Sequence, residues 1–173
     1  MRKKLILLAA MAALGAGLLA LQSTHLSSAT QEAAASATPK FTPYEKQKAV
    51  YQVSRAGGWF DKDYKRILGI AENHMNALGP ESLDLRIVLS GEGLGLLRDA
   101  KSNAGLAEMV HRLKQKGAQF LVCANTLASQ KIDPARDLYD VAPQDIVRAG
   151  IAEITKLQLQ GFAYVQQIGR AHV

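Results

Sequence analysis

The residue best suited to chemistry in this chain is Cys123, the only cysteine among 173 residues. It ends a short, continuously apolar run, residues 120–122, which is typical of a buried strand in a parallel sheet. A segment of a buried helix fits the same run. In open α/β sheets, ligands and reactive groups collect at the carboxyl ends of the strands. The sequence therefore predicts a thiol presented at the functional edge of a sheet.

Polar residues follow the thiol directly, with Asn125 and Thr126 two and three positions further on. The thiolate is the reactive form of cysteine, and nearby hydrogen-bond donors lower its pKa. Asn125 and Thr126 are therefore predicted to stabilise a thiolate or the terminal sulfur of a persulfide. Two alternatives stay open. A free cysteine is often a small buried hydrophobe, and an unpaired cysteine also allows a disulfide between two chains.

A second motif, residues 91–95, reads Gly-Glu-Gly-Leu-Gly between a predicted strand and a predicted helix. We predict that Gly91, Glu92 and Gly93 form a tight turn at the same edge as Cys123 and line a pocket there. The motif lacks the Gly-x-Gly-x-x-Gly spacing of dinucleotide-binding folds, so a nucleotide is not expected. The four histidines are scattered and no Cys-x-x-Cys pair is present, so neither a metal nor another cofactor is expected.

The surrounding pattern predicts strands alternating with helices, which favours a parallel sheet covered on both faces. Asp61 or Asp63 is expected to cap the first long helix, in which His74 is a weak alternative for a catalytic base. The aromatic residues Trp59 and Phe60 precede that helix and fit a pocket, a subunit contact or packing of Trp59 on the helix.

The expected strands are residues 48–53, 85–89, 119–123, a short strand within 141–147, and 162–168. The expected helices are residues 64–78, a short helix through Leu97 and Ala100, 104–116 and 150–160, with Gly79 and Gly117 as the stops of the first and the third. The apolar side of the first helix is predicted to contain Tyr64, Ile67, Leu68, Ala71, Met75 and Leu78, and that of the last helix Ile151, Ile154, Leu157 and Leu159. Residues 90–95 are expected to form a flexible turn that enters the short helix.

Several of these segments together resemble the DsrE/DsrF-like family of small sulfur-relay proteins. They are Lys48-Ala-Val-Tyr-Gln-Val53, Asn73-His-Met-Asn-Ala-Leu-Gly79, Leu85-Arg-Ile-Val-Leu-Ser-Gly91, Phe120-Leu-Val-Cys-Ala-Asn-Thr-Leu127 and Gly150-Ile-Ala-Glu-Ile154. The Cys-x-Asn-Thr-Leu block is the most specific. The resemblance implies a three-layer α/β/α fold with a mostly parallel sheet of about five strands. It also implies that Cys123 carries transferred sulfur, and that the protein forms a homo-oligomer.

The N-terminus has the layout of a secretory signal peptide, with a basic start (Met1-Arg-Lys-Lys4) and an apolar stretch over residues 5–21. We expect cleavage after Ala29, with Ala35 as a second choice and an uncleaved membrane anchor as the alternative. The predicted organisation is a signal peptide over 1–29, a flexible linker over 30–44, an α/β domain over 45–168 and a tail over 169–173. All three N-terminal outcomes put the domain outside the cytoplasm, in the periplasm or its equivalent.

Charge gives little support for a polyanionic partner. Removal of Arg2, Lys3 and Lys4 lowers Lys plus Arg from 21 to 18 against 15 acidic residues, so the net charge falls from +6 to +3. Nucleic acid is therefore not expected as a partner. The resulting hypothesis is an exported sulfur carrier or sulfurtransferase that holds sulfane sulfur on Cys123. Its donor or acceptor would be a protein or a small sulfane-sulfur compound. The alternative is a noncatalytic binding or assembly module with an inert, buried cysteine.

Overall fold

Five short strands, rich in Val, Ile, Leu and Tyr, form one parallel sheet in the order β4-β3-β2-β1-β5. The computed structural model describes residues 42–79 and 81–166. Because β1, β2 and β3 lie inside the sheet, they are apolar along almost their whole length, as strands covered on both faces must be. The strands are β1 (Gln47–Val53), β2 (Leu83–Leu89), β3 (Gln119–Cys123), β4 (Ile146–Val147) and β5 (Ala163–Gln166).

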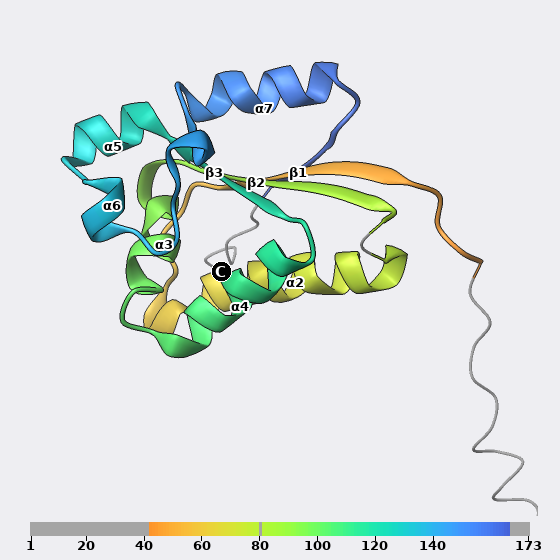
Figure 1. Cartoon of the computed structure of the whole chain (residues 1–173), viewed down its shortest axis with the longest axis horizontal. Helices are drawn as coiled ribbons and strands as arrows, with labels where there is room; N and C mark the ends of the chain where they lie inside the picture. The colour runs from red at the N-terminus through yellow and green to blue at the C-terminus, as the bar shows by residue number, and fades with distance from the viewer. Residues whose placement is uncertain (1–41, 80, 167–173) are drawn as a thin grey trace, which may run out of the picture. The chain divides into compact units, whose positions relative to one another are not determined.

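Helices cover both faces of this sheet, so the predicted three-layer α/β/α fold is confirmed (Figure 1). Helices α2 and α4 lie against one face and α7 lies against the other. The α-helices are α2 (Lys62–Leu78), α3 (Gly95–Asp99), α4 (Ala104–Gln115), α5 (Ala124–Gln130), α6 (Pro134–Asp137) and α7 (Gly150–Leu159). Short 3₁₀ helices lie between these elements in the described part of the chain: η1 (Trp59–Asp61), η2 (Gly91–Leu94) and η3 (Pro143–Asp145).

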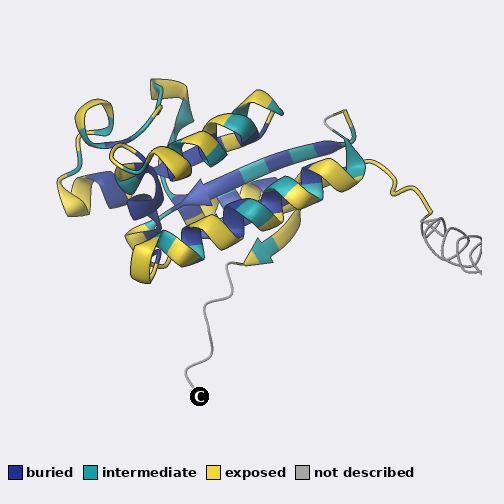
Figure 2. Ribbon diagram, turned by 90° about the horizontal axis from the view of Figure 1, so that it is seen from below, coloured by how far each residue is buried: buried dark blue, intermediate teal, exposed yellow. Residues whose placement is uncertain are grey.

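The two faces bury different amounts of apolar side chain. The larger cluster lies between the sheet and α2, α3 and α4, and includes the predicted stripe of α2, namely Tyr64, Ile67, Leu68, Ala71 and Met75. The smaller cluster lies under α7 and contains Val50, Val88, Leu121, Ile154, Leu157 and Phe162. Alternating residues of each strand enter opposite clusters, as the two-residue period of a strand requires. Figure 2 shows this buried centre between exposed helix surfaces.

Three local expectations were wrong. Asp61 is the N-cap residue of α2, but it has a left-handed backbone and its side chain caps no amide; Asp63 lies inside the helix. The segment after β2, where a flexible turn was expected, forms the 3₁₀ helix η2. On α7, Ile151 and Leu159 are exposed although they were assigned to the apolar side. The stops of α2 and α4 are confirmed at Gly79 and Gly117, which have positive φ.

Some expectations fall outside the described residues. These are the signal peptide over 1–29, most of the linker over 30–44, the tail over 169–173, and the histidines at 25 and 172. Within residues 42–79 and 81–166, no helix is both long enough and apolar enough to cross a membrane.

Candidate functional site

Cys123 is the last residue of β3 and the N-cap residue of α5, so it lies at the carboxyl edge of the sheet, as predicted. Its neighbours on the strand show which face it occupies. Phe120 and Val122 belong to the larger cluster, and Leu121 belongs to the cluster under α7. Because side chains alternate along a strand, Cys123 points toward α7. There the backbone N–H of Gly150, the first residue of α7, donates to Sγ of Cys123 at 3.2 Å.

Hydrogen-bond donors from two helix starts surround the sulfur. Burial raises the pKa of the Cys123 thiol, but hydrogen bonds oppose it: from the Thr126 hydroxyl first, then from the N–H groups of Gly150, Thr126 and Asn125. Their sum lowers the pKa of the thiol below its usual range. The side chain is nevertheless only 5% exposed. The arrangement thus favours a thiolate while shielding it from solvent.

Space beside the sulfur depends on Gly150. An added Cβ at that position would lie 3.2 Å from Cβ of Ser90 and 3.5 Å from Cβ of Cys123. Ser90 therefore borders the thiol, although sequence reasoning did not single it out. The available signal was its position as the first residue after β2, at the same edge of the sheet.

The predicted site residues come together only in part. Thr126 is buried, and its Oγ1 also accepts from the N–H of Gly91 at 3.0 Å, so Thr126 joins η2 to the thiol. Asn125 is exposed and contributes its backbone N–H, where its side chain had been expected. Gly93 is buried against β1: an added Cβ there would lie 2.0 Å from the carbonyl oxygen of Val53. Gly91 and Glu92 are exposed.

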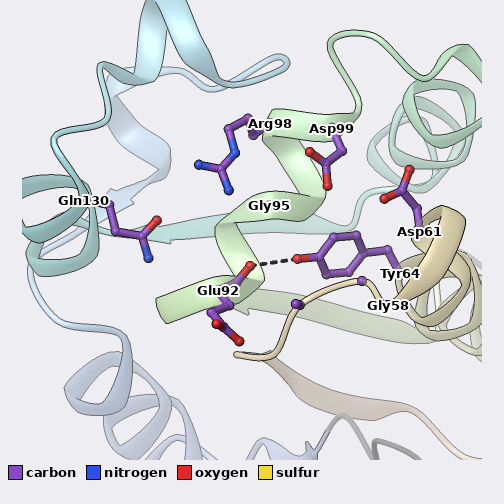
Figure 3. Close-up of a pocket in the computed structure, with 10 residues that line it drawn as sticks. Gly58, Asp61, Tyr64, Glu92, Gly95, Arg98, Asp99 and Gln130 are labelled. Carbon is purple, nitrogen blue, oxygen red and sulfur yellow. Dashed lines mark hydrogen bonds between the residues drawn. The ribbon is translucent and has the colours of Figure 1, made fainter.

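An open pocket of about 360 Å³ lies beside η2; Glu92 lines it, whereas Gly91 and Gly93, which were also predicted to line a pocket, do not. Its walls come from the β1–α2 loop, η2, α3 and Gln130 of α5 (Figure 3). The Tyr64 hydroxyl donates to the carbonyl oxygen of Glu92 at 2.7 Å, and burial raises the pKa of Tyr64 to about 12. Cys123 does not line this pocket. Tyr64 belongs to the cluster under α2, so the pocket and the thiol lie on opposite faces of the sheet.

The remaining predicted residues lie apart from the thiol. His74 belongs to α2, on the other face: its Nε2 donates to Gln47 Oε1 at 2.8 Å, and its Nδ1 accepts from the Tyr51 hydroxyl at 3.1 Å. Burial lowers the pKa of His74, which favours the neutral ring that these two hydrogen bonds require. Trp59 and Phe60 stack on one another and are 78% and 87% exposed, so Trp59 does not pack on α2. Across the described ranges, no three His, Cys, Asp or Glu side chains are grouped to hold a metal ion.

Comparison with known proteins agrees with this fold. Residues 40–166 match the model of the DsrE/DsrF-like family. A solved structure of a protein of unknown function from Methanobacterium thermoautotrophicum is 23% identical, with a TM-score of 0.57. That match covers 70% of this chain and 99% of the other, and it bears on the fold alone. A search of curated proteins finds no significant match.

Proposed function

Because the chain belongs to the DsrE/DsrF-like family of sulfur-relay proteins, we propose that it is a sulfur carrier that holds sulfane sulfur as a persulfide on Cys123. The observation that carries this proposal is the set of donors aimed at one sulfur atom. Three backbone N–H groups and one hydroxyl lower the pKa of the thiol despite its burial. Such a site supplies the thiolate that sulfur transfer needs.

The chemistry requires no metal or redox cofactor. The Cys123 thiolate attacks the outer sulfur of a sulfane donor such as thiosulfate; a new S–S bond forms, the donor's S–S bond breaks, and sulfite leaves with the electron pair. The outer sulfur of the Cys123 persulfide then passes to an acceptor thiolate, which restores the Cys123 thiolate. Hydrogen bonds from Gly150 and Thr126 stabilise the anionic sulfur at the start and the end of the cycle.

The noncatalytic alternative rests on one specific observation, the burial of Cys123. An inert core cysteine is surrounded by apolar atoms, which raise its pKa. Cys123 differs because it lies outside both apolar clusters among the described residues, and polar donors offset its burial. A carrier with so little exposure accepts sulfur from a small donor more readily than from a bulky one.

The decisive experiment is intact mass spectrometry of the domain before and after exposure to thiosulfate, polysulfide or glutathione persulfide. We expect added mass in whole sulfur atoms that is lost on reduction. Cys123→Ser should take up none. Thr155→Val is the matched control, since its hydroxyl bonds only within the exposed face of α7, and it should load normally. An unchanged wild-type mass, with a thiol that resists small alkylating reagents until the protein unfolds, would support the binding module instead.

Export and self-association belong to the same proposal. The basic start and apolar stretch over residues 1–21 support export, so sulfur would be held outside the cytoplasm. Expression in an exporting bacterium, followed by fractionation and intact mass, tests this: a periplasmic protein cut after Ala29 is expected. Light scattering of the same sample tests the expected homo-oligomer; a monomer at all concentrations would contradict it.

A further inference from the structure

The pocket beside η2 separates its charges by sign. In Figure 3 the carboxylates of Asp61 and Asp99 face one another on one side, whereas the guanidinium of Arg98 points away from them, toward Gln130. Arg98 and Asp99 are consecutive residues of α3, whereas Asp61 comes from the β1–α2 segment and Gln130 from α5. The pocket thus has an acidic end and a basic end.

The acidic end is built to accept a positive group. The carboxyl groups of Asp61 and Asp99 face one another across this end, and the charge of Asp61 disfavours ionisation of Asp99. Asp61 accepts from Nδ2 of Asn103 at 2.8 Å, which holds its carboxylate in place. Burial, and then the charge of Asp61, raise the pKa of Asp99, while the charge of the neighbouring Arg98 lowers it. An ammonium group between the two side chains would offset their like-charge repulsion.

The basic end carries the guanidinium of Arg98, whose charge also acts on the adjacent Asp99. Within residues 42–79 and 81–166, Arg98 makes no salt bridge and no side-chain hydrogen bond, and it is exposed on the pocket wall. A guanidinium binds a carboxylate through two parallel hydrogen bonds. Gln130 opposite it has a fixed amide, because Nε2 donates to the carbonyl oxygen of Gly91 at 3.0 Å.

The geometry points to a binding site for a small zwitterion of the α-amino acid type, with its carboxylate on Arg98 and its ammonium between Asp61 and Asp99. The volume of about 360 Å³ lies in the range of small-molecule pockets. A compound with only one of the two charges leaves half of the pocket unpaired. A free amino acid and the γ-glutamyl end of a peptide such as glutathione share the required head group.

This site does not depend on sulfur transfer, since none of its charged groups touches Cys123. It lies close to the thiol site nevertheless. Gln130 bonds the carbonyl of Gly91, the N–H of Gly91 bonds Thr126, and the Thr126 hydroxyl donates to the sulfur. Binding can therefore be measured with or without the thiol.

The test is a titration followed by amide NMR, with glycine, L-cysteine and glutathione as full head groups and with acetate and ethylammonium as half ligands. If the site takes a free amino acid, glycine or cysteine should shift the amide signals of Gly57, Gly58 and Gly95 in a saturable way. If it takes a γ-glutamyl peptide, glutathione alone should do so. Each half ligand should bind at least about tenfold more weakly, as loss of one charge-assisted contact predicts. Cys123→Ala should bind as the wild type does, which keeps this result separate from the fate of sulfur loading.

Variants assign the two ends. Arg98→Gln should weaken binding of the full head group about tenfold or more and leave binding of ethylammonium unaffected. Asp99→Asn should weaken binding of the full head group by a similar factor and leave binding of acetate unaffected. Glu81→Gln, an exposed change at the opposite edge of the sheet, should alter nothing. Signal dispersion confirms folding, and Arg98 is exposed, so that variant remains informative if Asp99→Asn unfolds. No saturable shift with any full head group, half ligands that bind equally well, or an unaltered Arg98→Gln would each overturn the inference.

Discussion

The thiol site and the charged pocket lie at the same edge of one sheet but shift ionisation in opposite directions. At Cys123, backbone N–H groups and the Thr126 hydroxyl outweigh burial and lower the pKa of the thiol. At Asp99, burial acts first, the charge of Asp61 adds to it, and the pKa of the carboxyl rises. Hydrogen-bond donors thus stabilise an anion on the face under α7, whereas burial and then a like charge disfavour one on the face under α2.

The difference follows from what each face offers. The thiol lies beside the first N–H groups of α5 and α7, which have no hydrogen-bond acceptor within their own helices. The pocket instead collects side-chain charges from segments that end at the sheet edge independently. η2 separates the two sites and contacts both, through Gly91 toward Thr126 and through Glu92 toward Tyr64. Changes in η2 should therefore affect both sites together, and changes elsewhere should separate them.

The largest effect is expected for Gly93→Ala. An added Cβ would lie 2.0 Å from the carbonyl oxygen of Val53, a backbone atom that cannot rotate away. We expect a loss of about 3 kcal/mol or more in the free energy of unfolding, measured with urea. Gly69→Ala in α2 is the control, because its Cβ would meet no atom within 4 Å. It should stabilise the protein by about 0.5–1 kcal/mol through helix propensity. Equal stabilities of the two variants would show that η2 does not pack on β1 in this way.

The sequence predicted the fold better than it predicted the sites. Strand and helix periods, with Gly79 and Gly117 as stops, suffice for three layers because local pattern and global fold agree there. The prediction that an aspartate side chain caps α2 was wrong because the Asp61 carboxyl interacts with Asn103 and Asp99 instead of with the first amides of the helix. The prediction that Ile151 and Leu159 lie on the apolar side of α7 was wrong because the buried stripe of this helix is narrower than its composition suggested.

The two sites differ in how far sequence can reach them. Cys123 was found because a single thiol after an apolar run is a local signal. The donors on it were found only in part, since a backbone N–H such as that of Gly150 leaves no trace in residue type. Of the residues predicted to line a pocket, only Glu92 lines this one. Asp61, Arg98 and Gln130 are brought together by the fold, and their spacing in the sequence does not indicate a shared site.

A smaller effect should separate the thiol from the pocket. Thr126→Val removes the hydroxyl that donates to Cys123 and accepts from Gly91, at nearly constant volume. The pKa of the thiol should rise, so the pH at which iodoacetamide alkylation reaches half its plateau should move upward. Loss of one hydrogen bond predicts a shift of roughly 0.4–1 pH unit. Thr155→Val should leave the midpoint unchanged. A downward or absent shift in Thr126→Val would mean that backbone N–H groups alone govern the thiol.

The smallest effect is expected for Asp99→Asn. It concerns a carboxyl whose pKa is raised, whereas the pKa of the Cys123 thiol is lowered. Because the pKa of Asp99 is raised in the folded protein, its contribution to stability is present below the ordinary aspartate pKa and is lost as pH rises through the folded value. Asparagine keeps a neutral partner for Asp61 at every pH, so the variant should gain stability relative to wild type as pH rises through that window. Urea midpoints measured across the acidic range for wild type, Asp99→Asn and Glu81→Gln provide the comparison. If the wild type instead gains stability over Asp99→Asn as pH rises, then Asp99 is held as an anion, and both regions of this edge stabilise negative charge.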